Sequence, residues 1–225
     1  MSNIFDKMKT LSSELYLQIA KGNREIESSE LTKYTWTNRI FRGDRFRRGH
    51  IEVLDVIESK KMWIMHICIF PHLDDSSPIF GFDVICGANK ITGVFLDFSC
   101  SDEHHHMNIW FKKRTKNLVW KKDRELPDWG QRIFSPNMIA AGQVNTDEEL
   151  NQIIDVAKDC LHYYLNNVGS TISNVSSVLA HNHYCVNQKQ NVHTQRFLVN
   201  CGYDPTEVKT FIDKHLFPEI EPNYP

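Results

Sequence analysis

The sequence predicts an α/β protein in which helices cover a central antiparallel sheet. Short apolar runs bounded by Pro or Gly, typical of strands, occupy the middle of the chain. Apolar residues at helical spacing occupy both ends. This order favours a sheet with helices packed on its faces. The 225 residues, 41% of them hydrophobic, suffice for one sizeable core, so we expect a single domain over residues 1–225.

The first expected elements are an amphipathic helix and a series of strands. The helix covers residues 4–20, and its apolar stripe is formed by Ile4, Met8, Leu11, Leu15 and Ile19. Strand-like segments follow at residues 49–57, 62–70, 79–86, 91–98 and 107–111. Because the links between them are short, we expect neighbours in the chain to pair as an antiparallel meander.

Three helices are expected after the strands. Thr146, followed by acids at 147–149, predicts the N-cap of a long helix that ends at about Val168, before Gly169. A second helical stretch covers about 176–200 and ends at Gly202. Asp204 and Pro205 start a third.

Composition excludes several classes of protein. A formal net charge of −2 gives no broad basic field for nucleic acid. The sequence has no run of about 20 apolar residues for a membrane span, and no hydrophobic signal peptide begins it. The six cysteines are dispersed without a CxxC pair, which favours reduced thiols over disulfides or an iron–sulfur cluster. We therefore expect a soluble, cytoplasmic monomer.

Two ionisable residues interrupt apolar strands: His66 within Met62–Pro71, and Asp83 within Pro78–Cys86. Burying a carboxylate costs free energy unless it has a partner. Burial also changes the pKa of a carboxyl group, and a reaction can use a group with such a shifted pKa. The plainer alternative is an Asp at a strand end that reaches solvent or a loop amide.

A second carboxylate is expected beside His66. The turn at 58–61 predicts a β-hairpin between the strand at 49–57 and the His66 strand. Cross-strand neighbours share a face, so Glu52 and Asp55 are both candidates until the register is known. Two acids and an imidazole in an apolar slot can transfer protons.

Other clusters indicate other chemistry less clearly. His104, His105 and His106 resemble a metal site, but neighbours in a strand alternate faces, which favours a solvated loop. Of His181, His183 and Cys185, only the first and last share a helical face. A metal-dependent hydrolase is therefore a distant alternative.

One local basic cluster runs from Lys112 to Arg124, interleaved with aromatic residues. Its plain interpretation is a solvated edge of the molecule. An acidic electron donor or acidic substrate groups are the functional alternatives. The sequence contains no glycine-rich phosphate loop and no dinucleotide fingerprint, so it offers no bound redox cofactor.

Four segments together resemble the ferredoxin-dependent bilin reductases, nearest the phycocyanobilin:ferredoxin oxidoreductase branch. They are Phe46–Val53; His66–Pro71 with Pro78–Asp83; Arg124–Gly130 with Ile133–Ser135; and a helix pattern of His183–Cys185, Gln188, Asn191, Thr194 and Arg196. The resemblance covers about residues 46 to 217 and implies a three-layer α/β/α sandwich, with the substrate between the sheet and the C-terminal helices.

The resemblance also implies the reaction. The substrate would be biliverdin IXα, reduced by single electrons from an external [2Fe–2S] ferredoxin, while the protein supplies binding, orientation and protons. Asp83 would donate the first proton and share it with His66. Glu52, or Asp55 in its place, would be the third acid.

The substrate-binding residues implied by the resemblance are His50, Arg124, Asn191 and His193, with Arg124 on a propionate. This chain departs from the branch in three places. Val192 replaces an acid, His193 replaces a lysine, and the hairpin loop after Glu52 is two residues longer. We therefore favour the marine-phage side branch that forms phycoerythrobilin over formation of phycocyanobilin. A non-catalytic bilin-binding protein of the same fold is the alternative.

Overall fold

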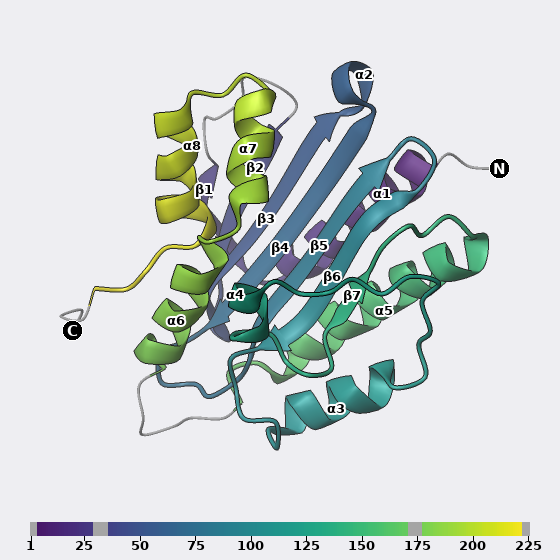
Figure 1. Cartoon of the computed structure of the whole chain (residues 1–225). Coiled ribbons are helices and arrows are strands. Elements are labelled where there is room, and N and C mark those ends of the chain that lie inside the picture. Colours follow the sequence, from purple (N-terminus) through teal and green to yellow (C-terminus); the bar gives the residue numbers. More distant parts are fainter. Residues whose placement is uncertain (1–3, 29–35, 171–176, 222–225) are drawn as a thin grey trace.

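A computed structural model, which describes residues 4–28, 36–170 and 177–221, contains a seven-stranded antiparallel sheet (Figure 1). The order of the strands in the sheet is their order in the chain. They are β1 (Arg24–Ser28), β2 (Trp36–Arg42), β3 (Phe46–Val56), β4 (Met62–Pro71), β5 (Ile79–Gly87), β6 (Ile91–Ser99) and β7 (Ile139–Ala141). The expected meander is therefore confirmed.

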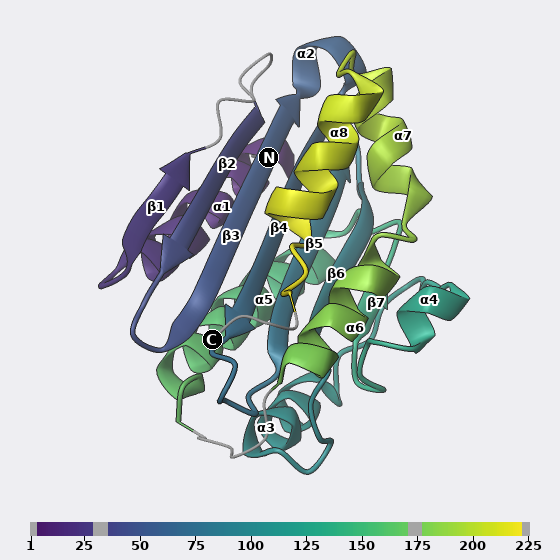
Figure 2. The same ribbon diagram turned by 90° about the vertical axis from the view of Figure 1, so that its left-hand side faces the viewer.

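Helices cover both faces of this sheet, as Figure 2 shows from the side of the C-terminal helices. In chain order they are α1 (Ile4–Ala20), α2 (Ile57–Lys60), α3 (His106–Thr115), α4 (Asp128–Gln131), α5 (Asp147–Asn167), α6 (Val178–Gln188), α7 (Val192–Asn200) and α8 (Pro205–Phe211). We call the face under α1, α3 and α5 the inner face, and the face under α6, α7 and α8 the outer face. The expected α/β/α layering is confirmed.

The inner face is a continuous apolar core. Alternate residues of the central strands, such as Met65 and Ile67 of β4 and Phe82 of β5, point to it and are fully buried. Leu15 of α1 and Tyr164 of α5 close it from the other side. The expected apolar stripe of α1 therefore packs where the sequence predicted it.

The outer face is apolar only in part. Phe70 of β4, Tyr184 of α6, Leu198 of α7 and Phe211 of α8 form a smaller core there. Between these residues, the alternate positions of β3, β4 and β5 carry ionisable side chains instead. The fold thus separates a packed face from a polar one.

The expected strand at 107–111 is wrong, because these residues lie in α3. His105 is the N-cap, and its Nδ1 accepts a hydrogen bond from the backbone N–H of Met107 at 3.3 Å. A five-residue segment with four apolar residues suits a buried strand and a buried helix turn equally well. His105, the N-cap that precedes these residues, favours the helix.

The expected helix over 176–200 is also wrong in its continuity, and residue 176 lies outside the described residues. The structure has α6 and α7, separated by residues 189–191. Asn191 starts α7 as its N-cap, since its Oδ1 accepts from the backbone N–H of His193 at 3.1 Å.

The other helix boundaries agree with the sequence. Thr146 caps α5 through a 3.2 Å hydrogen bond from the backbone N–H of Glu149, and Gly169 follows the helix with a φ of 77°. Asp204 caps α8. All six cysteines are free. In the part of the chain that the structure describes, none of the helices combines the length and apolar composition that a membrane crossing requires.

Candidate active site

Four polar residues form a row across the outer face. Asn38 of β2 lies opposite Glu52 of β3, Glu52 opposite His66 of β4, and His66 opposite Asp83 of β5. Phe95 of β6 continues the row beyond Asp83. Opposite residues of an antiparallel pair share a face, so the register alone brings these side chains together.

His66 and Asp83 form a close pair within this row. His66 Nδ1 lies 2.6 Å from Asp83 Oδ1. The His66 side chain is 8% exposed and that of Asp83 is 36% exposed, so the carboxylate is the accessible member. His66 Nε2 is buried and has no hydrogen-bond partner among the described residues. The pair can therefore act on a ligand through Asp83.

The electrostatics of the pair favour a stored proton. Burial by itself lowers the pKa of His66, but the charge of Asp83 and its hydrogen bond outweigh burial and hold that pKa well above its usual range. The imidazole is therefore protonated at neutral pH.

Glu52 is a buried acid beside the pair. Its side chain accepts a hydrogen bond from Trp36 Nε1 at Oε1, over 2.7 Å. Burial raises the pKa of Glu52 to about 7, although His66 and the Trp36 hydrogen bond lower it. Near neutral pH Glu52 is therefore partly protonated and can donate or accept a proton.

His50 lies next to Glu52 on the same face of β3 and is fully buried. Its Nε2 lies 3.0 Å from Asn38 Oδ1, and its Nδ1 has no hydrogen-bond partner among the described residues. Burial, with smaller contributions from His66 and Arg48, holds the pKa of His50 well below its usual range. The ring is therefore neutral, and its Nδ1 can bind a substrate group but hold no stored proton.

Asp55 lies apart from the row. It is three residues from Glu52, so strand alternation sends it to the inner face, opposite Trp63. There its Oδ2 pairs with Lys9 Nζ of α1 at 2.7 Å, and its Oδ1 accepts from the backbone N–H of Ile57. Of the two acids that the sequence left open, the structure brings only Glu52 to His66.

Arg124 reaches the outer face at the edge of the sheet. Its guanidinium carbon is 5.8 Å from the ring centroid of Phe95, the residue opposite Asp83. Its backbone N–H bonds to the carbonyl of Ala140 in β7. The side chain is exposed, so its charge is available to an anionic group one strand away from Asp83.

Asn191 and His193 lie at the start of α7. Asn191 uses its Oδ1 as the helix cap, and His193 is exposed. Within the described residues, no hydrogen bond joins either side chain to His66 or Asp83.

Three buried polar residues of this face were missed by the sequence analysis. Trp36 and Asn38 lie on β2, a strand that the sequence did not predict. Asp97 of β6 is 1% exposed and binds Ser99 Oγ at 2.6 Å and the backbone N–H of Ser135 at 2.8 Å. Strand alternation places Asp97 on the face of Phe95 and was the available signal. Its bonds hold the segment after α4 against β6.

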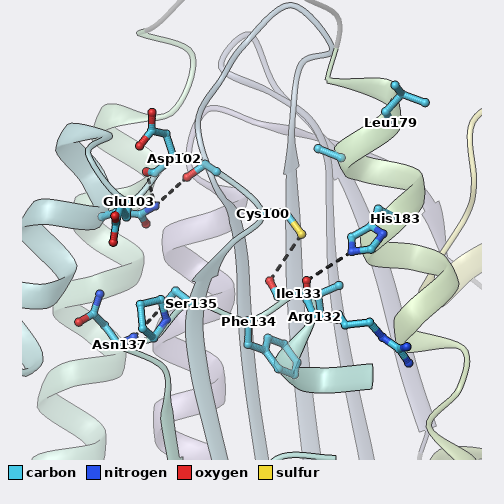
Figure 3. Close-up of a pocket in the computed structure, with 14 residues that line it drawn as sticks. Cys100, Asp102, Glu103, Arg132, Ile133, Phe134, Ser135, Asn137, Leu179 and His183 are labelled. Atoms are coloured by element: carbon cyan, nitrogen blue, oxygen red, sulfur yellow. Dashed lines mark hydrogen bonds between the residues drawn. The ribbon is translucent and has the colours of Figure 1, made fainter. Parts of the chain in front are cut away.

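A cavity of about 720 Å³ lies beside that segment (Figure 3). Its lining comes from the β6–α3 link, α3, the segment after α4, and α6, and includes Cys100, Ile133 and His183 but neither His66 nor Asp83. In the figure His183 points toward the carbonyl of Arg132, to which its Nε2 lies at 3.3 Å. This cavity is therefore separate from the polar row.

The histidine clusters take ordinary structural positions. His105 caps α3, while His104 and His106 are exposed. His181 Nε2 lies 2.7 Å from the carbonyl of Pro218. Over residues 4–28, 36–170 and 177–221, no group of three or more His, Cys, Asp or Glu side chains is placed to hold a metal ion.

Comparisons with known proteins agree on one family. A family model described as ferredoxin-dependent bilin reductase matches residues 2–218. The chain is 27% identical over 187 residues to a phycocyanobilin:ferredoxin oxidoreductase of Synechococcus sp. (strain CC9902), covering 80% of this chain and 74% of the relative. It is 29% identical over 195 residues to the enzyme of the same name from Prochlorococcus marinus (strain MIT 9515), covering 80% and 76%.

Two solved structures share the fold. The structure of a protein named PcyX has a TM-score of 0.69 at 24% identity, covering 95% of this chain and 99% of that one. Phytochromobilin synthase from tomato, solved in complex with biliverdin, has a TM-score of 0.72 at 18% identity, covering 93% and 82%. The seven-stranded sheet with helices on both faces is thus the architecture of these proteins.

Proposed function

This chain belongs to the ferredoxin-dependent bilin reductase family, and we propose that it reduces biliverdin IXα to a phycobilin. As a ferredoxin-dependent bilin oxidoreductase it receives its electrons from ferredoxin. The observation that carries the proposal is the His66–Asp83 pair, with its accessible carboxylate and its buried, charged imidazole.

The proposed chemistry needs protons as well as electrons. Biliverdin takes up four electrons, one at a time from reduced ferredoxin, and four protons in forming a phycobilin. The proton stored on His66 passes across the 2.6 Å contact to Asp83, which donates it to the tetrapyrrole over the outer face. Both groups lie on adjacent strands of a rigid sheet, which keeps donor and substrate aligned.

Glu52 is proposed as the third acid. Its position opposite His66 and its pKa of about 7 support this role. Asp55, the other candidate, is paired with Lys9 on the inner face and has no path to the same substrate.

Four residues are proposed to bind the substrate. Arg124 provides a charge for a propionate beside Phe95. His50 offers its buried Nδ1 beside Glu52 on β3. Asn191 and His193 contribute from the start of α7, where the helix N-terminus also favours an anionic group.

For the product we propose phycoerythrobilin, as in the marine-phage side branch of the family, rather than phycocyanobilin. Two departures of the sequence support this choice. Val192, 48% exposed at the start of α7, replaces an acid, and α2 occupies the lengthened hairpin loop after Glu52. Proton delivery then depends chiefly on Asp83 and His66, and Glu52 has an auxiliary role.

The test is an anaerobic assay with biliverdin, ferredoxin and a reducing system, followed by chromatographic identification of the product. We expect a 1:1 complex that turns blue-green and forms phycoerythrobilin. Phycocyanobilin would overturn the proposed product only. Binding without turnover would make the chain a bilin carrier, and a spectrum unchanged on mixing would refute the substrate.

The variant Glu52→Gln tests whether proton delivery requires Glu52, which is the difference in mechanism that we propose between formation of the two products. If Glu52 is auxiliary, the variant turns over at a moderately lower rate and releases the same product. If Glu52 is essential, the variant accumulates an intermediate that has taken up two electrons. Asp55→Asn is the matched control, because it changes an acid of the same strand on the other face, and its turnover should equal that of the parent protein.

A further inference from the structure

The two buried tryptophans of the central sheet differ in the use of their indole N–H. Trp63 of β4 is 1% exposed on the inner face, and its Nε1 has no hydrogen-bond partner among the described residues. Trp36 of β2 is 2% exposed on the outer face, and its Nε1 donates to Glu52 Oε1 at 2.7 Å. Only the second indole touches an acid of the candidate site.

The bond from Trp36 is one of two that share a geometry. In the β2–β3 register Trp36 lies opposite Leu54, and its indole reaches Glu52, two residues away on the same face. Asn38 lies opposite Glu52 and reaches His50, again two residues away. The same diagonal step therefore links His50 and Glu52, the two buried polar side chains of β3, to β2.

Trp36 is itself held from above. Its ring centroid lies 4.7 Å from that of Tyr203 and 4.5 Å from that of Phe211, both in edge-on contacts. Tyr203 lies in the α7–α8 link and Phe211 ends α8. With the sheet below and these rings above, the indole has one direction in which to aim its N–H, and Glu52 Oε1 lies there.

We propose that Trp36 is a positioning residue for Glu52. Its indole N–H donates a hydrogen bond to Oε1 of the carboxyl group, so that Oε2 is the oxygen that carries the proton. The importance of this proton for bilin reduction rests on the proposed function. The orientation of the Glu52 carboxyl group is independent of that function.

The chemical reason is the asymmetry that one donor imposes on a carboxyl group. An oxygen that accepts an N–H bond behaves as the carbonyl oxygen of the neutral acid, so the proton resides on its partner. Burial raises the pKa of Glu52 to about 7. The hydrogen bond from Trp36 acts in the opposite direction, because it stabilises the carboxylate. Loss of the donor should therefore raise that pKa further.

Infrared titration of the bilin-free protein tests this directly. The carbonyl band of protonated Glu52 is assigned by its loss in Glu52→Gln and followed with pH. In Trp36→Phe, which keeps an aromatic ring but lacks the donor, we expect the midpoint to rise by about one pH unit. Trp63→Phe is the matched control, and its midpoint should equal that of the parent protein. An unchanged midpoint in Trp36→Phe overturns the proposal.

A second measurement needs no change at Trp36. In ¹⁵N-labelled protein, the indole N–H signal of Trp36 should shift with pH at the midpoint of the Glu52 band, and this shift should vanish in Glu52→Gln. The Trp63 signal should not follow that midpoint. A Trp36 signal that is flat across this range overturns the proposal even if Trp36→Phe fails to fold.

Turnover assays then separate the positioning role of Trp36 from the proposed reduction of biliverdin. If Trp36 positions a working acid, the alkaline limb of the turnover–pH profile moves with the infrared midpoint in Trp36→Phe. If both midpoints move as expected but the parent protein never reduces biliverdin, the proposed function fails and the positioning role stands.

Discussion

The two faces of the central sheet are built from the same strands but have opposite chemistry. On the inner face, Met65, Ile67 and Phe82 belong to the apolar core that the sheet forms with α1 and α5. On the outer face, their immediate neighbours His66 and Asp83 are a charged pair. Successive side chains of a strand point to opposite faces of the sheet, and this alternation alone separates the apolar residues from the charged pair.

This difference shows how a protein of this size can support a costly site. Buried charges destabilise a fold unless they are paired, and the outer core is smaller than the inner one. The inner face supplies apolar burial on the far side of the same backbone, which fixes the strands on which the polar row depends. Changes on the two faces should therefore have separable effects.

The largest effect is expected for Asp83→Asn on the outer face. The amide keeps the shape of the side chain but cannot donate a carboxylic proton, so turnover should fall by about 10²–10⁴-fold while biliverdin still binds. Electron paramagnetic resonance should show a radical that persists after the first electron. Normal product formation by this variant would refute the role of Asp83.

The neighbouring change on the inner face should have the reverse profile. Ile67→Ala leaves a cavity in the packed core and should lower the free energy of unfolding by about 2–5 kcal/mol, as measured by urea denaturation. Turnover below the unfolding transition should change little. If this variant lost activity while folded, the two faces would not be independent.

The pH dependence of stability should isolate Glu52. An unfolded glutamate loses its proton near pH 4.5, whereas folded Glu52 keeps it to about pH 7. The folded state therefore binds more protons between these values, and its stability falls as pH rises through them. Glu52→Gln removes this loss, so relative to the parent protein it should gain about 3 kcal/mol between pH 4 and pH 8. An equal pH slope in both proteins would contradict the raised pKa.

The smallest effect is expected from the basic cluster. Lys112 and Lys113 are exposed on α3, and Lys121 and Lys122 are exposed in the segment that leads to Arg124. If an acidic ferredoxin docks there, Lys121→Glu with Lys122→Glu should slow turnover without changing biliverdin affinity. Added salt should mimic the change, because such attraction is screened over about 8 Å at physiological ionic strength.

Two further variants make the docking test specific. Lys112→Glu with Lys113→Glu asks whether the α3 half of the cluster also contributes. Lys60→Glu changes an exposed lysine of α2, outside the cluster, and should leave the rate unchanged. A turnover rate that is independent of salt in all of these proteins would place docking elsewhere.

The sequence predicted those parts of the fold whose pattern is local and strong. β4 to β6 are largely apolar, and α5 has its own N-cap, so each could be identified in isolation. β1 and β2 are rich in polar and charged residues, and they become strands only by pairing, β2 with β3 and β1 with β2. The apolar run at 107–111 failed because its length permits either structure.

The candidate site was predictable to the same degree. His66 and Asp83 stood out as ionisable residues in apolar strands, but the choice between Glu52 and Asp55 needed the register. That register follows from α2, a one-turn helix that ends at Lys61 in the left-handed conformation and brings Val56 opposite Met62. Trp36 could not be found, because its role exists only through pairing of β2 with β3.

The equality of strand order and chain order bears on how the protein folds. Asn38, Glu52, His66 and Asp83 are separated by only 14 to 17 residues along the chain, so each contact closes a short loop at small entropic cost. The α1–α5 contact marked by Lys7 and Asp147 closes a loop of 140 residues. We therefore expect the reactive row to form in the early, low-contact-order part of folding, before the terminal helices dock.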